Sequence, residues 1–341
     1  MSVVVPLFNA ASTIVAALDS IKATNWPSLE VIVVDDGSKD NGVETVLEYA
    51  RANEGPRVTL LRHADGGNHG PAAARNLGIE SASGEFVSFL DADDLYLPNR
   101  FNAAMEMLAA EPELDAVYGV YRYGFPGGYE TCRDVTAEHL KSSAFDDADL
   151  TQPQLALLLS GKSGVHTSTI TMRRQAARAL GGFPKLKYVD DLAFWMRLFA
   201  TGQVRRVDTE PVSIYVVHPD SWCSRGQASD DFLFGPAIAC LNALEWTGAR
   251  AMPDALRRMI EQSLVSKLLS RYHSVVLRGR ASQKALLSLM LRTLKLAPRL
   301  LIRKAYLAVL ARLVLNIHPD IPRPSESSTS EFPAQGKTNE P

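Results

Sequence analysis

The stretch LEVIVVDDGS (residues 29–38) decides the fold class of this chain. Its apolar run is almost unbroken, which is typical of a strand that is covered on both faces of a parallel sheet. Similar runs lie on either side of it, at residues 2–8, 57–63 and 84–94, and segments with a helical pattern separate them. This regular alternation predicts an α/β fold, with a Rossmann-like, mostly parallel sheet and helices on both faces.

The chain of 341 residues, 46% of them apolar and 22% charged, has the composition of a globular protein. Its pattern changes twice, so we expect three regions. Residues 1–229 are predicted to form the α/β domain, with two halves, 1–118 and 119–229. An almost wholly helical, basic region follows (230–319), and the last residues (320–341) are rich in Pro, Ser and Glu, which predicts disorder.

Cysteine is sparse, with Cys132, Cys223 and Cys240 far apart in the sequence. An odd number at wide spacing argues against a disulfide framework or a zinc cluster and fits a reducing compartment. No apolar run reaches the roughly 20 residues of a membrane-spanning helix. The start, MSVVVPLFNA, lacks the basic segment of a signal peptide. We therefore expect a cytoplasmic protein.

The net charge of −2 hides a segregation of charge. Thirteen basic residues and one acidic residue, Glu261, lie between positions 257 and 312, which gives 13 − 1 = +12. Because leucines alternate with these cations, the helices could lie peripherally on an anionic membrane surface, the inner face of the plasma membrane. A packed bundle or a dimer contact with a solvated basic face is the alternative. Nucleic acid is not an expected partner, since the interleaved residues are aliphatic and not aromatic.

Carboxylates follow two of the predicted strands: Asp35 and Asp36 after one, and Asp91, Asp93 and Asp94 after another. The carboxyl ends of parallel strands share one edge of the sheet, where ligands bind. So many carboxylates together are unfavourable without a cation or donors to receive them. Mg²⁺ and Mn²⁺ take oxygen ligands, usually one or two carboxylates plus phosphates, so Asp-x-Asp predicts a metal–diphosphate site. Alternatively, such aspartates only cap helices or shape turns.

Four motifs in order, VVVPLFNA, VIVVDDGSKD, GPAAARNLGI and GEFVSFLDADD, resemble those of the family 2 glycosyltransferases, which have the GT-A fold. The resemblance extends over roughly residues 2 to 220. It implies that residues 1–229 are a catalytic domain with a nucleotide-sugar-binding half (1–118) and an acceptor half (119–229). It implies transfer of a sugar, with inversion, from a nucleotide-diphospho-sugar (a UDP-, GDP- or dTDP-sugar) to a glycan, lipid-linked or other hydroxyl acceptor. It also implies dependence on a divalent cation, Mn²⁺ or Mg²⁺.

The resemblance assigns roles to the donor half of the site. The expected donor-binding residues are Pro6, Phe8, Asn9, Asp35, Asp36, Arg75 and Asp91. Among them Asp36 would bond the edge of the base, Phe8 would lie against its face, and Arg75 would steady the diphosphate. Simple core packing is the alternative for Phe8, and a salt bridge on a helix surface is the alternative for Arg75.

For the metal, the resemblance implies Asp93 as a direct ligand and Asp91 in the ribose and metal shell. Asp94 is expected to cap the following turn. His218, in YVVHPDSWCS (215–224), is expected to complete the metal shell or to contact the diphosphate. A purely structural histidine is the alternative.

An inverting transfer also needs a base on the opposite face of the sugar. In GGFPKLKYVDDLAFWMRL the resemblance places Asp190 where the family usually has Glu, and makes Asp191 the catalytic base. Because a helix start favours the ionised carboxylate, Asp191 needs burial to reach a useful pKa. The alternative is that both are helix-capping acids. Trp195 and Arg197 are expected to have structural roles.

Two rival functions remain open. FLDADD also resembles the signature of haloacid-dehalogenase phosphatases, but that signature belongs to a first strand, and Leu95 follows it here. The rival from another class is a catalytically silent nucleotide-sugar-binding or scaffolding protein. The joint presence of Asp36, Asp91, Asp93 and Asp191 favours the enzyme.

Overall fold

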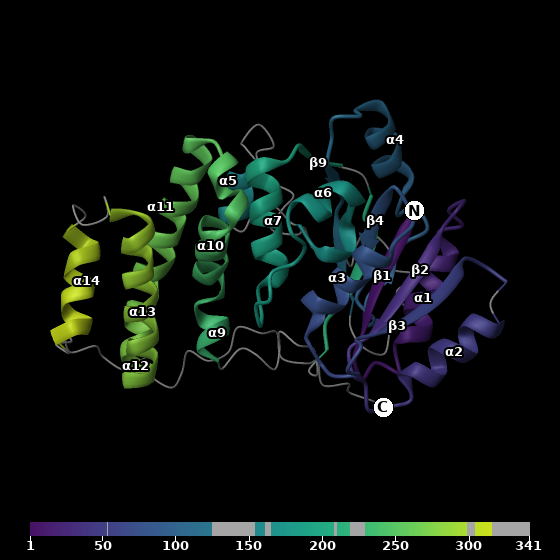
Figure 1. Cartoon of the computed structure of the whole chain (residues 1–341), viewed down its shortest axis with the longest axis horizontal. Helices are drawn as coiled ribbons and strands as arrows, with labels where there is room; N and C mark the ends of the chain where they lie inside the picture. Colours follow the sequence, from purple (N-terminus) through teal and green to yellow (C-terminus); the bar gives the residue numbers. More distant parts are fainter. Residues whose placement is uncertain are drawn as a thin grey trace, which may run out of the picture. The chain divides into compact units, whose positions relative to one another are not determined.

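The computed structural model (Figure 1) describes residues 1–52, 54–124, 154–160, 165–207, 210–218, 229–298 and 304–315. The tail expected over 320–341, Cys132 and Cys223 lie outside these residues. The chain forms two compact units, Met1–Leu264 and Val265–Pro341. The unit that contains the sheets thus continues past residue 229, and the boundary expected there stays a prediction.

The first unit is built on a seven-stranded sheet in the order β3-β2-β1-β4-β8-β6-β9. Its strands are β1 (Ser2–Leu7), β2 (Glu30–Asp35), β3 (Arg57–Arg62), β4 (Phe86–Phe89), β6 (Ala116–Tyr118), β8 (Ile170–Arg173) and β9 (Val204–Arg206). Neighbours pair in parallel except β8, which is antiparallel to both β4 and β6. The predicted mostly parallel α/β sheet is confirmed, and β1, β2 and β4 end at one edge of it.

Helices cover both faces of this sheet (Figure 1). The covering helices include α1 (Ile14–Ala23), α2 (Gly42–Ala52), α3 (Pro71–Ser81), α4 (Asn102–Ala110), α6 (Arg174–Ala179) and α7 (Asp190–Thr201), and α5 (Gln154–Ser160) packs on α7. Since strand side chains alternate, Val3 and Val5 pack toward α1 and α2, whereas Val4 meets Gly78 of α3. A Cβ on Gly78 would lie 2.2 Å from Cγ1 of Val4, so glycine allows α3 to approach the sheet this closely.

A second sheet of three strands has the order β5-β10-β7, with β5 (Leu95–Tyr96), β7 (Tyr121–Gly124) and β10 (Ser213–Val216). The segments 115–125 and 204–218 therefore each contribute one strand to each of the two sheets. The two segments stay parallel neighbours as they cross, because the Val207 N–H donates to Tyr118 O and the Val212 N–H to Val120 O, both at 2.8 Å. This crossing places β7 and β10 beside the end of β4.

The predicted helical region is confirmed in α9 (Asp230–Leu233), α10 (Gly235–Glu245), α11 (Asp254–Ser270), α12 (Tyr272–Arg278), α13 (Arg280–Leu296) and α14 (Lys304–Leu315). Helix α10 packs on α7, where Arg197 donates to Oδ1 of Asn242 at 2.6 Å and to two backbone carbonyls. Arg197 and the buried Trp195 thus have the structural roles expected for them. Among the described residues, none of the helices combines the length and apolar character that crossing a membrane requires.

Candidate active site

Arg75 joins two carboxylates that are about a hundred residues apart in the sequence. It lies on α3, is 5% exposed, and donates to Oδ1 of Asp91 at 2.6 Å and to Oδ2 of Asp190 at 3.0 Å. Burial alone would lower its pKa, but the two carboxylates outweigh burial and raise it, so the guanidinium stays charged. The strand-end carboxylate and the start of α7 therefore belong to one site.

The acid pair at the start of α7 is partly withdrawn from water. Asp190 is 5% exposed, and burial raises its pKa to about 7 although Arg75 acts in the opposite direction. Burial also raises the pKa of Asp191, against the lowering effects of Arg75 and of a hydrogen bond from the Leu192 N–H. The condition set for Asp191 as a base, burial that offsets the helix start, is therefore met.

Asp93 is paired with His218, whose Nε2 lies 2.8 Å from its Oδ2. The side chains of Asp91 and Asp93 are 29% and 36% exposed, so both present oxygen atoms to solvent at the sheet edge. Burial and the neighbouring Asp91 raise the pKa of Asp93, and His218 lowers it. The two outer members of the Asp-x-Asp motif and His218 thus lie together.

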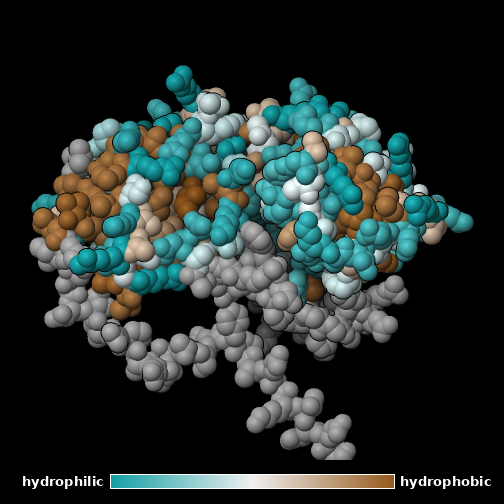
Figure 2. Space-filling model, turned by 60° about the horizontal axis from the view of Figure 1, so that its bottom comes forward, coloured by the Kyte–Doolittle hydropathy of each residue, from teal (hydrophilic) through white to brown (hydrophobic). Residues whose placement is uncertain are grey.

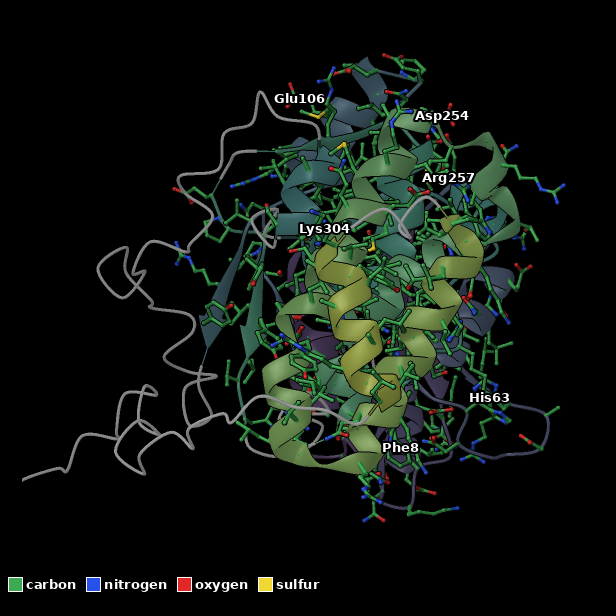
Figure 3. The ribbon with its side chains drawn as sticks, turned by 90° about the vertical axis from the view of Figure 1, so that its left-hand side faces the viewer. Phe8, His63, Glu106, Asp254, Arg257 and Lys304 are labelled. Atoms are coloured by element: carbon green, nitrogen blue, oxygen red, sulfur yellow. The ribbon has the colours of Figure 1, made fainter. Side chains whose placement is uncertain are left out.

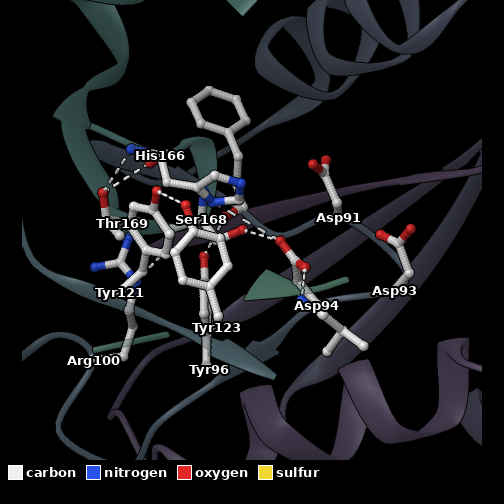
Figure 4. Close-up of polar contacts among 12 residues, drawn as sticks. Asp91, Asp93, Asp94, Tyr96, Arg100, Tyr121, Tyr123, His166, Ser168 and Thr169 are labelled. Atoms are coloured by element: carbon white, nitrogen blue, oxygen red, sulfur yellow. Dashed lines mark hydrogen bonds and ion pairs between the residues drawn. The ribbon is translucent and has the colours of Figure 1, made fainter. Parts of the chain in front are cut away.

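The turn-cap role expected for Asp94 is wrong. Its side chain is buried and turns away from its own turn: Oδ2 accepts from Ser168 Oγ at 2.8 Å, and Oδ1 accepts from the Val216 N–H at 3.0 Å (Figure 4). Burial, together with Asp91 and Asp93, raises its pKa well above the usual range. Asp94 therefore ties the end of β4 to the small sheet and to the residues before β8.

His166 is a site residue that no motif or periodic pattern in the sequence indicates. Its Nδ1 accepts the Ser168 N–H at 3.3 Å, which leaves the ring proton on Nε2. Burial lowers its pKa, although Asp91 and Asp191 raise it, so the neutral imidazole stands among the site carboxylates.

The ring of His166 is part of an aromatic group on the small sheet. Its centroid lies 5.0 Å from that of Tyr121 and 4.9 Å from that of Tyr215. Tyr123 completes the group, 5.9 Å from Tyr215 and with its hydroxyl 3.2 Å from that of Tyr121. Tyr123 is 51% exposed, so the group presents an aromatic surface beside Asp94 (Figure 4).

Asp36 shapes the loop of glycines that begins α3. Its two carboxylate oxygens accept the backbone N–H groups of His69 at 2.7 Å and Gly70 at 2.9 Å. Gly37 follows at φ 79°, and a Cβ there would lie 2.9 Å from Gly67 C. The neighbouring Asp35 accepts the Ser38 N–H at 2.9 Å. Both carboxylates are thus engaged with the loops that border the expected nucleoside pocket.

The other residues expected at the nucleoside end lie at the end of β1. Phe8 is 38% exposed and so is available to a ligand, unlike the buried Leu7 beside it (Figure 3). Asn9 has a positive φ of 50° and accepts the Lys39 N–H at 2.7 Å, while Pro6 is half-buried within the strand. The hydrogen bond between Asn9 and Lys39 connects the end of β1 to the loop that follows β2.

The side chains present fit a hard divalent cation only in part. Carboxylate oxygens and a histidine nitrogen are suitable donors, but in the described segments no three His, Cys, Asp or Glu side chains converge as a metal cluster. Mg²⁺ and Mn²⁺ in phosphate-transfer sites take one or two carboxylates, and substrate phosphates supply the rest. Asp91 and Asp93 match that smaller requirement.

The fold and this edge of carboxylates define a GT-A protein, and the comparisons give its family. The family model described as "Glycosyl transferase family 2" matches residues 2–181, more than half of the chain. The chain therefore belongs to glycosyl transferase family 2.

Its relatives and structural neighbours carry glycosyltransferase names. The glycosyltransferase YibD of Escherichia coli K12 is 36% identical over 167 residues, which cover 49% of this chain and 46% of YibD. WfgD of E. coli, a UDP-Glc:alpha-D-GlcNAc-diphosphoundecaprenol beta-1,3-glucosyltransferase, is 33% identical over 121 residues, 36% of this chain and 45% of WfgD. The chain thus spans about half the length of these curated relatives.

Two solved structures share the fold over most of the chain. TarS of Staphylococcus aureus (residues 1–349, in complex with UDP-GlcNAc) has a TM-score of 0.59 at 19% identity, covering 92% of this chain and 91% of TarS. The mannosyltransferase PcManGT of Pyrobaculum calidifontis, in complex with GDP-Man and Mn²⁺, has a TM-score of 0.52 at 19% identity, covering 93% and 87%. At this identity the likeness concerns the fold.

Proposed function

We propose that this protein is an inverting glycosyltransferase that moves a sugar from a nucleotide-diphospho-sugar to a hydroxyl acceptor. The observation that carries the proposal is the bridge from Asp91 through Arg75 to Asp190, which brings Asp191 to the edge where β4 ends. A donor site and a candidate base thus meet in one place. Family membership and the UDP- and GDP-sugars named for WfgD, TarS and PcManGT support a nucleotide-sugar donor.

In the reaction, the acceptor oxygen attacks the anomeric carbon from the face opposite the diphosphate. The new C–O bond forms while the bond from that carbon to the phosphate oxygen breaks, and the bonding electrons leave with the nucleoside diphosphate. Asp191 accepts the acceptor's hydroxyl proton. Its raised pKa suits this role, because a base works best when its pKa approaches the working pH.

Asp91 and Asp93 would hold the divalent cation, Mn²⁺ or Mg²⁺, with His218 beside Asp93. The cation would neutralise charge on the departing diphosphate. Arg75 donates to Asp91 and Asp190 and would therefore orient the two carboxylates. Its Nε has no partner among the described residues, and its role in steadying the diphosphate stays a prediction. The Mn²⁺ in the PcManGT complex supports a metal of this kind.

For the nucleoside end, Phe8 would stack on the base beside Pro6 and Asn9. Asp36 is buried and already has contacts to His69, Gly70 and His63, so it would meet the base edge only at the border of that loop, which Asp35 would support. The acceptor half would use the exposed ring of Tyr123 beside His166, since aromatic rings pack well against the apolar face of a sugar. The acceptor class is a glycan or lipid-linked saccharide, as the name of WfgD suggests, on the cytoplasmic side of a membrane.

The test measures release of UDP or GDP from a panel of nucleotide-sugars with Mn²⁺ and candidate acceptors. We expect turnover that EDTA abolishes, and a loss of about 10² to 10⁴ in kcat for Asp191→Asn, the size of a general-base contribution. Donor binding, measured as metal-dependent thermal stabilisation, should survive in that variant. Tight donor binding without turnover in the wild type would instead support a catalytically silent sugar-nucleotide-binding protein.

A further inference from the structure

The last described helix, α14, leaves a wide apolar face uncovered. Its buried side chains, Tyr306 and Leu313, face α13, where the Tyr306 hydroxyl donates to Met290 O at 2.6 Å. The opposite face consists of the exposed residues Leu307, Ala308, Ala311, Val314 and Leu315, and we call it the α14 face. Leu307, Val314 and Leu315 are 38%, 61% and 64% exposed, and Figure 2 shows apolar residues gathered where α14 lies.

A helix that is apolar on both sides is not a stable solvent-facing element. An ordinary surface helix would carry polar side chains opposite its buried stripe, whereas the only charges of α14 are Lys304 near its start and Arg312 near its end. Something other than water therefore covers the α14 face.

Charge identifies the partner. Between Glu261 and Asp320 the sequence contains no acidic residue. The neighbouring helix α13 carries exposed cations at Arg280, Lys284 and Lys295, whose spacing of four and eleven residues keeps them on one side of the helix. An apolar face with a one-sided supply of cations is the signature of a helix that lies in the interface of an anionic bilayer.

The other occupants fit less well. A second copy of the chain would bring its own cations against these, without acidic partners from the same helices. The residues after α14 are rich in Pro, Ser and Glu and offer Ile317, Ile321 and Phe332 as their large apolar side chains, too few to cover this face. Nucleic acid would match the charge but would leave the aliphatic face exposed to water.

We infer that the α14 face, with the cations of α13, docks this protein onto the surface of anionic phospholipid bilayers. The apolar side chains enter the boundary between headgroups and acyl chains, and the lysines and arginines meet the phosphates. Docking would be peripheral. It is independent of the proposed reaction, because it rests on helices of the second compact unit.

The experiment is co-sedimentation of the full chain with phosphatidylglycerol vesicles and with phosphatidylcholine vesicles. We expect binding to phosphatidylglycerol alone, and a marked loss at about 1 M ionic strength, where the Debye length is about 3 Å. The double variant Leu307→Gln/Val314→Gln should lower the partition coefficient by at least about tenfold, because each lost apolar contact removes transfer free energy. Its matched control is Val15→Gln/Leu47→Gln, at exposed positions (both 39%) on helices of the other unit, which should bind as the wild type does.

The charge arm compares Lys284→Gln/Lys295→Gln with Lys22→Gln/Arg51→Gln, which also removes two exposed cations. The inference is overturned if the wild type does not sediment with phosphatidylglycerol, or if test and control variants lose binding equally. It is also overturned if Leu307→Gln/Val314→Gln converts a dimer to a monomer by light scattering without any vesicle binding, or if vesicles bind only after residues 316–341 are removed. Nucleotide release in vesicle-free buffer tests the reaction separately, so the two proposals can fail independently.

Discussion

Replacing Asp190 by Asn should change how the stability of this protein depends on pH. Asp190 is 5% exposed and is held by Arg75, yet burial raises its pKa from 3.8 to about 7. Asn has nearly the same shape and cannot ionise. The substitution therefore removes one titration from the folded state and leaves the packing of α7 in place.

The sign and size follow from the two pKa values of Asp190. Between about pH 4 and pH 7 the unfolded chain releases the Asp190 proton while the folded chain keeps it, so the unfolding free energy of the wild type falls as pH rises. The slope is about 1.4 kcal/mol per pH unit for one proton. Over the roughly three units between 3.8 and 7 this amounts to about 4 kcal/mol, and no further loss occurs above the folded pKa.

The assay is urea denaturation from pH 4 to pH 8 in EDTA, followed by tryptophan fluorescence. The four tryptophans, Trp26, Trp195, Trp222 and Trp246, all precede residue 264, so the signal reports the compact unit that contains the site. The wild-type unfolding free energy minus that of Asp190→Asn should decrease by about 4 kcal/mol across this range. A difference that is flat, or that increases with pH, would refute the reasoning, because it would mean that Arg75 overcomes the effect of burial.

Substitutions of Arg75, Gly78 and Tyr123 test three other features of the structure. Arg75→Met should lower the unfolding free energy by about 3–5 kcal/mol, since it leaves the buried Asp190 and the partly exposed Asp91 without their partner, and Arg75→Lys should restore little because one ammonium cannot span both. Gly78→Ala should lower it by about 1–3 kcal/mol through overpacking against Val4, measured by the same denaturation. Tyr123→Ala should raise the acceptor KM by up to about tenfold with the donor KM unchanged, whereas Tyr123→Phe should retain most of the affinity; equal changes for donor and acceptor would count against an acceptor role.

The parallel part of the fold could be predicted because each buried strand is a near-continuous apolar run that ends in a polar turn. The segment LEVIVVDDGS contains both signals, and β2 begins and ends within it. The second sheet could not be predicted in this way. Neither Gly119 in residues 115–125 nor the polar residues in 204–218 show that the strands on either side of them belong to different sheets, because the crossing depends on hydrogen bonds between segments far apart in the sequence.

The carboxylates of the site could be found from their positions at strand ends and at a helix start, but their partners could not. Arg75 looks in the sequence like any arginine on a helix, and only the packing of α3 shows that it meets both Asp91 and Asp190. His166 stands in a stretch with no periodic pattern, so no local signal distinguishes it. The turn-cap prediction for Asp94 is wrong for a related reason. A turn cap and a buried anchor have the same sequence, and the donors that decide between them, Ser168 Oγ and the Val216 N–H, come from residues far away in the sequence.

Burial raises the pKa of Asp93, Asp190 and Asp191, so the ionised forms of these acids are disfavoured unless positive charge lies near them. Arg75 is the one guanidinium shown in contact with the carboxylates of Asp91 and Asp190, and the pKa of Asp93, Asp190 and Asp191 is raised in spite of the cations near them. A hydrophobic residue in place of any of these acids would remove the electrostatic cost, so the acids must be compensated in a state with more positive charge. Under the proposed function, a divalent cation held by Asp91 and Asp93 would bring that charge, and the acceptor hydroxyl would give Asp191 a proton to take. We therefore expect the electrostatic cost to be greatest in the free protein and to fall when donor and cation bind.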